Sequence, residues 1–77
     1  MAQKPDLSVS KIKSAATKKL KRSHQKSTST QEITDYIRSE YGSTHVVRHD
    51  YIDKAIREMI SSGKLRRLSR HGWVQLT

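Results

Sequence analysis

The spacing of apolar residues changes at Gly63 from that of a helix to that of a strand. Before this glycine the apolar residues recur three and four positions apart, as on one face of an α-helix; they are Ile52, Ala55, Ile56, Met59 and Ile60. After it, the stretches LRRLS and WVQLT flank the short segment RHG, which predicts a β-hairpin. Gly63 can adopt the left-handed conformation that ends a helix. We therefore expect a helix followed by a hairpin whose inner face closes the core.

Two further helices are predicted upstream. The first is capped by Ser8 or Asp6, and its apolar face consists of Val9, Ile12, Ala16 and Leu20. In the second, Ser29 and Glu32 have the spacing of a capping box, and Gly42 is the expected stop. The apolar face of this second helix consists of Ile33, Tyr36, Ile37 and Tyr41.

The remaining boundaries complete the architecture. The segment RSHQKSTST between the first two helices has no apolar residue and is predicted to be a loop. The third helix begins either at Ser43 or Thr44, or later with Asp50 as its cap. Three helices followed by a two-stranded hairpin form a winged helix, a mostly helical α+β fold. We expect this domain to occupy residues 8–77, behind a disordered basic arm of residues 1–7.

The charge of the chain points to a nucleic acid as its partner. The 77 residues contain sixteen Lys and Arg against seven Asp and Glu, for a formal net charge of +9. Residues 1–28 hold eight of the basic and one of the acidic side chains, so the positive charge is concentrated at the front. A charge this high on one small domain is typical of nucleic-acid-binding proteins.

Other classes of function find little support in the sequence. The absence of cysteine excludes a disulfide and a thiolate metal site. His45 and His49 have a spacing that can chelate a metal on a helix, but no third ligand stands at a familiar distance. No catalytic set, no glycine-rich phosphate loop and no apolar run of about 20 residues is found. We therefore expect no enzymatic activity, no cofactor and no membrane partner.

Two segments resemble the globular domain of linker histones. They are TQEITDYIRSEYG and YIDKAIREMISSGKL, which resemble the second and third helices of that family. The resemblance covers roughly residues 8–77 and implies a winged helix that binds double-stranded DNA in the chromatin of the nucleus. It implies that Arg57 and Arg38 contact DNA, and it places Arg66 or Arg67 near the basic position of the wing. Asp53 departs from this pattern, because the family commonly has lysine there.

The candidate DNA-binding residues form three groups. Arg57 and Lys54 lie on the polar face of the third helix, where they can reach phosphates or base edges in a major groove. The wing supplies a second group. The basic first helix supplies a third, with a run from Lys18 to Arg22 that is followed by Lys26. The full set is Arg57, Lys54, Arg38, Arg48, Arg66, Arg67, Arg70, His71, Trp73, Lys11, Lys18, Lys19, Lys21 and Arg22.

Simpler roles compete for two of these residues. Arg57 can form an ion pair with Asp53 one helical turn earlier, which would leave it a solvated surface residue. Trp73 can cover the edge of the core against Leu68 instead of stacking on a sugar or a guanidinium group.

The expected function is binding of double-stranded DNA, including nucleosomal DNA, by a monomer with little sequence selectivity. Two alternatives stay open. A basic winged helix can bind structured RNA. It can also be a protein-interaction module, here with Tyr41, Leu68 and Trp73 as an apolar docking patch.

Overall fold

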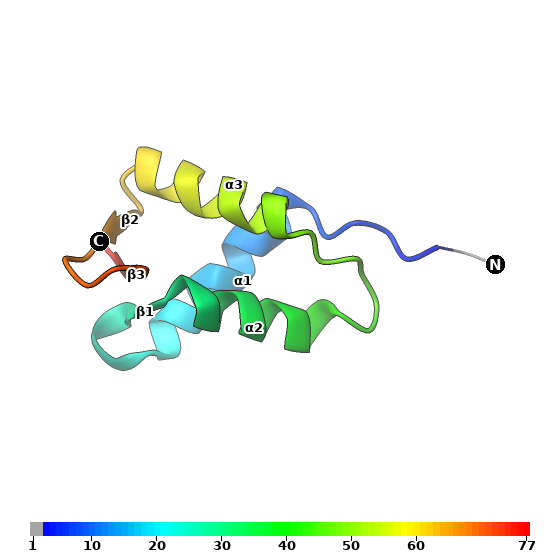
Figure 1. Cartoon of the computed structure of the whole chain (residues 1–77), viewed down its shortest axis with the longest axis horizontal. Coiled ribbons are helices and arrows are strands. Elements are labelled where there is room, and N and C mark those ends of the chain that lie inside the picture. The colour runs from blue at the N-terminus through cyan, green and yellow to red at the C-terminus, as the bar shows by residue number, and fades with distance from the viewer. Residues whose placement is uncertain (1–2) are drawn as a thin grey trace.

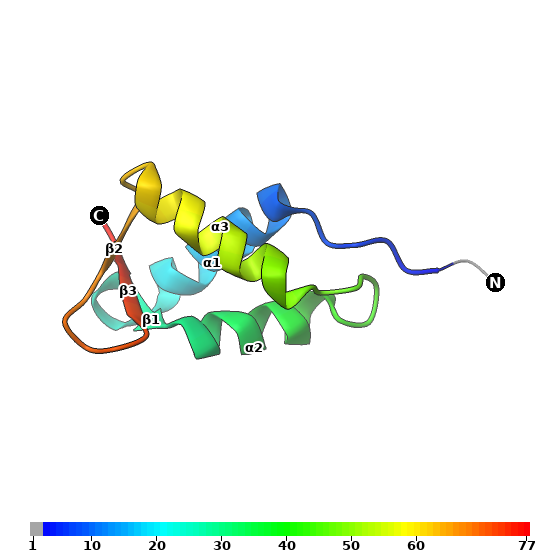
Figure 2. The same ribbon diagram turned by 45° about the horizontal axis from the view of Figure 1, so that its top comes forward.

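The computed structural model describes residues 3–77, which form three α-helices, a short 3-10 helix and a three-stranded antiparallel sheet (Figure 1). In chain order the elements are α1 (Val9–Arg22), η1 (His24–Lys26), β1 (Ser27–Ser29), α2 (Thr30–Tyr41), α3 (His49–Ser61), β2 (Leu65–Arg67) and β3 (Trp73–Leu76). The sheet lies at one end of the helical bundle, and the N-terminal segment leaves the opposite end (Figures 1 and 2). The predicted winged-helix fold, mostly helical α+β, is confirmed.

The first two helices begin where their caps predict. The hydroxyl of Ser8 accepts a hydrogen bond from the backbone N–H of Lys11 at 3.2 Å, and that of Ser29 accepts one from Glu32 at 3.1 Å. Each bond satisfies a backbone donor that has no partner within its helix. The Glu32 carboxylate, however, accepts from the hydroxyl of Thr28, so the second half of the predicted capping box is replaced by a contact with β1.

Helix α3 differs from the prediction at its start and agrees with it at its end. It begins at His49 with Arg48 as cap residue, while Asp50 lies in the first turn. Neither predicted start, at Ser43 or Thr44 or with Asp50 as cap, is therefore correct. At the other end Gly63 has φ +82°, and the N–H groups of Gly63 and Lys64 donate to the carbonyls of Ile60 and Met59. This is the Schellman arrangement, for which the glycine is needed.

The sheet contains one strand more than the predicted hairpin. Its order is β1-β3-β2, with both neighbours antiparallel to β3. The segment predicted to be a loop therefore holds η1 and β1. In the pairing register Thr28 faces Val74 and Leu65 faces Leu76. Thr28, Val74 and Leu65 are all buried, so the inner face of the sheet closes the core as expected.

One hydrophobic core joins the three helices to the sheet. The apolar faces predicted for the helices supply most of it, and Val9, Tyr36, Tyr41 and Ile60 pack at its margin. Its buried members are Leu7, Ile12, Ala15, Ala16, Leu20, Ile33, Ile37, Ile52, Ala55, Ile56, Met59, Leu65 and Val74.

The domain begins before the predicted boundary at residue 8. Leu7 is fully buried, and its N–H donates to the carbonyl of Val46 at 2.9 Å. The N–H of Val46 in turn donates to the carbonyl of Pro5 at 2.9 Å. The last residues of the predicted arm are thus part of the packed domain, while its first two lie outside the described residues.

Substitution of Leu7 tests this boundary. Because the side chain is fully buried, Leu7→Ala should lower the free energy of unfolding by about 2–5 kcal/mol, measured by urea denaturation. The matched control is Lys4→Ala, which removes a single exposed hydrogen bond to the carbonyl of Gly42. If both variants unfold at the same urea concentration as the parent chain, Leu7 does not belong to the core.

Candidate nucleic-acid interface

Most of the positive charge is not neutralised within the domain. Among residues 3–77, the Lys and Arg side chains that form ion pairs are Lys13, with Glu58, and Arg48, with Asp6 and Asp50. The other fourteen of the sixteen basic residues have no carboxylate within 4.0 Å in the described part of the chain. Their charge is therefore available to an external anion.

Helix α3 presents Lys54 and Arg57 on its exposed face, away from the core. The competing ion pair between Asp53 and Arg57 is not formed; the Asp53 carboxylate lies 3.6 Å from a ring nitrogen of His49 instead. Arg57 therefore stays free to meet a phosphate. The helix also carries Asp50, Asp53 and Glu58, however, so its Lys and Arg are outnumbered by carboxylates. Helix α3 by itself therefore has a slight negative charge and gives no net attraction to a polyanion.

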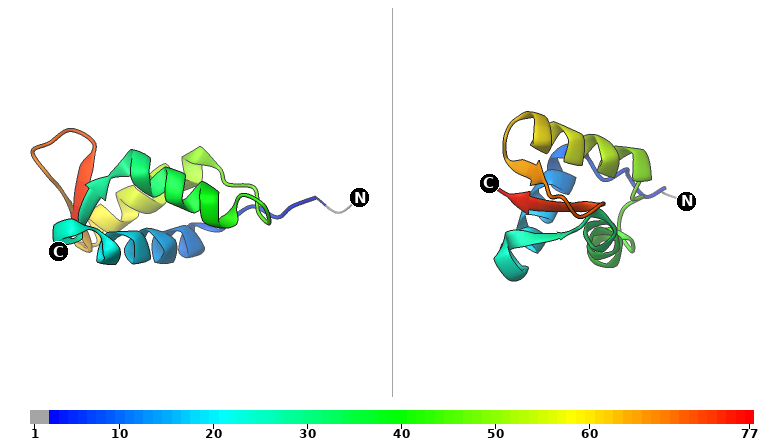
Figure 3. Two further views of the ribbon diagram at one scale, coloured as in Figure 1. Left: turned by 90° about the horizontal axis from the view of Figure 1, so that it is seen from below. Right: turned by 60° about the vertical axis from the view of Figure 1, so that its left-hand side comes forward.

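The wing carries the next group of basic residues. Arg66, Arg67, Arg70 and His71 are all exposed, on β2 and on the loop that extends beyond the helical bundle (Figure 3). The guanidinium group of Arg66 donates to the side-chain carbonyl of Gln75 on β3 at 2.9 Å. This bond fixes the Arg66 side chain on the outer face of the sheet without removing its charge.

Trp73 stacks on an arginine of the wing. The guanidinium carbon of Arg70 lies 4.3 Å from the centroid of the Trp73 ring, which is the geometry of a cation–π contact. Trp73 is not among the side chains packed against the core. The ring therefore holds Arg70 on the outer face of the sheet, and the structure favours the predicted guanidinium stack over the predicted packing against Leu68.

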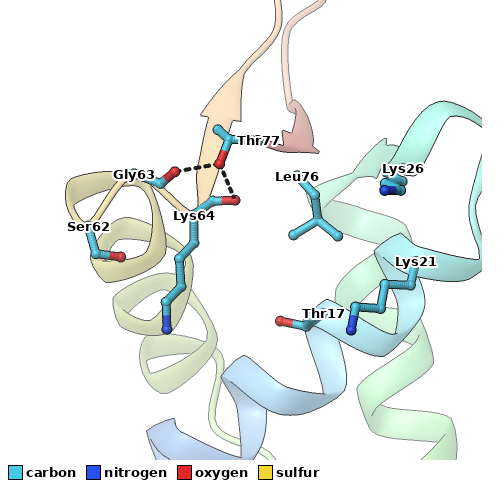
Figure 4. Close-up of a pocket in the computed structure, with 8 residues that line it drawn as sticks. All are labelled: Thr17, Lys21, Lys26, Ser62, Gly63, Lys64, Leu76 and Thr77. Carbon is cyan, nitrogen blue, oxygen red and sulfur yellow. Dashed lines mark hydrogen bonds between the residues drawn. The ribbon is translucent and has the colours of Figure 1, made fainter.

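A groove lined by lysines runs between α1 and the α3–β2 connection. Lys21 and Lys64 lie on two sides of it, with the hydroxyl of Thr17 between their ammonium groups (Figure 4). Lys13 and Lys18 continue its lining at one end and Lys26 at the other. We call the surface formed by Lys13, Lys18, Lys21, Lys26 and Lys64 the lysine groove.

The other basic residues predicted on α1 lie outside the lysine groove. Lys19 shares a shallow depression with Arg70 and Trp73, so it extends the wing surface. Lys11 and Arg22 are exposed at the two ends of the helix. The sequence did not identify Lys64 as a candidate binding residue, because it stands outside every predicted helix and strand. Only the turn at Gly63 brings it opposite α1.

The two remaining candidates have less favourable surroundings. Arg48 donates two hydrogen bonds of 3.1 Å to the carboxylate of Asp50, which raise the pKa of its guanidinium group. It also lies at the end of α3 away from the sheet (Figure 1). Arg38 is exposed on α2, together with Glu32, Asp35 and Glu40. The structure thus brings neither arginine to the wing or to the lysine groove.

The proposed apolar docking patch is not assembled. Tyr41 lies at the far end of α2 from the sheet, where its ring contacts His45 (Figure 1). Leu68 and Trp73 belong to the wing at the other end of the domain. Among the described residues, Val46 is the large hydrophobic side chain that is exposed, at 44%. The domain therefore presents scattered apolar residues rather than a patch.

Residues 3–77 lack the features of two other kinds of site. This part of the chain contains no group of three His, Cys, Asp or Glu side chains able to hold a metal ion. None of its helices has both the length and the apolar character needed to cross a membrane.

The pair formed by Lys13 and Glu58 makes stability depend on pH. The ammonium group lies 2.7 Å from the carboxylate and links α1 to α3. Its hydrogen bond lowers the pKa of Glu58 below the ordinary value of 4.5. Since the pKa is lower in the folded state, the pair stabilises the fold above pH 4.5, and this contribution is lost as the pH falls through the folded-state pKa.

The measurement is the urea midpoint of the parent chain and of Glu58→Gln between about pH 6 and about pH 3. The parent chain should be the more stable at the upper pH, and the difference should vanish at the lower one. A difference that stays constant over this range would show that the Glu58 carboxylate has the same pKa in both states.

Comparison with models of protein families gives a match to the linker histone H1 and H5 family over residues 6–74, nearly the whole chain. No curated protein and no solved structure matches the chain. The match agrees with the winged-helix fold and with the resemblance found in the second and third helices. The chain therefore belongs to the linker histone H1 and H5 family, whose members are DNA-binding architectural proteins of chromatin.

Proposed function

We propose that this domain binds double-stranded DNA with little sequence selectivity and mainly through phosphates. The observation that carries the proposal is the set of fourteen Lys and Arg side chains without a carboxylate partner in the described chain. Phosphate contacts give affinity without reading the sequence, because the DNA backbone is the same at every base pair. The family to which the chain belongs supports DNA over other polyanions.

The wing and the lysine groove offer one continuous path for a DNA backbone. Lys64 lines the groove, and Arg66 and Arg67 follow it directly on β2. The loop then carries Arg70 beside Lys19 of α1. Two carboxylates border this path: Glu58 of α3 pairs with Lys13, and Glu32 of α2 lines the depression that holds Lys19 and Arg70. The phosphates would therefore meet mainly Lys18, Lys21, Lys26, Lys64 and the arginines of the wing.

Helix α3 contributes contacts to phosphates rather than recognition of the base sequence. Arg57 and Lys54 can reach phosphates at the edge of a major groove, or lie along it. The carboxylates of Asp50, Asp53 and Glu58 on the same helix repel the backbone and disfavour deep insertion. We therefore place most of the affinity in the wing and the groove and little sequence selectivity in α3.

We place this activity on chromatin DNA in the nucleus, nucleosomal DNA included, with the domain acting as a monomer. If about six to eight phosphates are engaged, the logarithm of the affinity should fall with the logarithm of the salt concentration with a slope of about −5 to −7.

The lysine groove is tested by the double variant Lys21→Ala/Lys64→Ala. Loss of two phosphate contacts should make the slope shallower by about 2 and lower the affinity for a random-sequence duplex. The charge-matched control is Arg48→Ala/Arg38→Ala, which removes two arginines outside the wing and the groove. Equal losses in the two double variants would mean that total charge, and not this surface, determines binding.

The absence of sequence selectivity is tested by Arg57→Ala. This variant should weaken binding to duplexes of different sequence by the same factor, because the arginine contacts phosphate. A loss confined to one sequence would contradict the proposal. A folded RNA of equal charge serves as competitor, and displacement of the duplex at equal phosphate concentration would favour RNA as the ligand.

A further inference from the structure

The wing contains an arginine pattern that DNA binding does not require. Ser69 is preceded by Leu68 and, two and three positions before it, by Arg67 and Arg66. No other serine or threonine in the 77 residues has arginine at both positions. Two arginines at a fixed distance from a hydroxyl group form a pattern that an enzyme with matching carboxylates can select.

The structure makes this segment accessible. Strand β2 is at the edge of the sheet, so its backbone is paired with β3 on one side only. Arg66 and Arg67 are already extended and exposed, and Ser69 is exposed in the bend that follows. The hydroxyl group of Ser69 has no hydrogen-bond partner among residues 3–77. An enzyme can therefore reach both the arginines and the hydroxyl group without opening the core.

We propose that Ser69 is a phosphorylation site for a protein kinase that selects arginine two and three residues before the acceptor. In this reaction the Ser69 oxygen forms a bond with the γ-phosphorus of ATP, and the bond from that phosphorus to the bridging oxygen breaks. ADP leaves, and the proton of the hydroxyl group passes to the catalytic base of the kinase. The arginine side chains bind carboxylates of the kinase in the two-bond geometry that a lysine cannot reproduce.

The modification acts on the surface to which we assign DNA binding, and its effect on DNA rests on that proposed function. A phosphate group adds a charge of about −1.5 to −2 at pH 7. It offsets about half to two-thirds of the charge of Arg66, Arg67 and Arg70, the three arginines of the wing. The phosphate also competes with the Trp73 ring for the guanidinium group of Arg70, whose carbon lies 4.3 Å from the centroid of that ring. Phosphorylation of Ser69 thus lowers the charge of the wing from +3 to about +1 to +1.5 and weakens its attraction for phosphates.

The first experiment measures the modification itself. The full chain is incubated with the catalytic subunit of cyclic-AMP-dependent protein kinase and ATP with magnesium, and the site is identified by mass spectrometry. We expect one phosphate, on Ser69, and none in Ser69→Ala. The variant Arg66→Lys/Arg67→Lys keeps the charge and should react about tenfold more slowly or worse, because lysine lacks the fork of donors.

Equal phosphate incorporation in the parent chain and in Ser69→Ala would overturn the site. So would modification of Ser23 instead, which also follows two basic residues but whose hydroxyl group donates to the carbonyl of Lys19 at 2.7 Å. An unchanged rate in the double lysine variant would show that the arginine pattern is not what the kinase reads.

The second experiment compares duplex binding before and after phosphorylation. The modified chain should bind several-fold more weakly, with a salt slope shallower by about 2. Kinase-treated Ser69→Ala is the control and should bind like the untreated chain. Equal affinity of the modified and unmodified chains would overturn the regulatory role. If the unmodified chain fails to bind duplex DNA, the proposed function fails, while mass spectrometry still decides whether Ser69 is modified.

Discussion

The pairing of β1 and β2 with the central strand β3 holds the candidate DNA-binding surfaces of this domain together. Both outer strands bond to β3 and, within the described chain, to no other strand. Val74 on β3 is fully buried and faces Thr28 of β1, while Leu76 faces Leu65 of β2. The residues that follow α1 are thereby fixed beside the wing. Lys19 of α1 and Arg70 of the wing line one depression beside Trp73 of this strand.

The same few residues of β3 also shape the outer face of the sheet. Gln75 accepts a hydrogen bond from Arg66 and donates one to the backbone carbonyl of Gln25, so it connects β2 to the segment before β1. Trp73 holds the guanidinium group of Arg70 above its ring. A small domain with fourteen cations free of carboxylate partners must keep like charges apart, and these neutral partners fix two of them in place without neutralising them.

The helices of this fold could be predicted from the sequence, and its long-range contacts could not. Ile33 and Ile37 repeat at helical spacing, and Gly63 marks a helix end by its conformational freedom, so each signal is local. Strand β1 is made of Ser and Thr, which show no alternation of polar and apolar residues, and it forms only because β3 lies beside it. Leu7 has no apolar neighbour in sequence, and it is buried because the backbone of Val46 pairs with its segment.

In the candidate interface, too, local features could be predicted from the sequence and long-range contacts could not. The wing arginines and the lysines of α1 stand out in the sequence because no acidic residue lies among them. Lys64 joins them only through the turn at Gly63. Arg48, equally basic in the sequence, is held by Asp50 and lies near Asp6, a residue far from it along the chain. Charge pattern thus predicts which side chains can bind an anion, and the tertiary structure decides which of them are near one another.

The proposed function requires that DNA contacts the wing and the lysine groove. The most direct measurement is a titration of the isotope-labelled chain with a short random-sequence duplex, followed by the backbone amide signals in NMR. We expect the largest shifts around Lys18, Lys21, Lys64 and the wing, with smaller ones on α3 at Arg57. Shifts confined to α2 and to the segment around Tyr41 and Val46, with the wing unchanged, would contradict it.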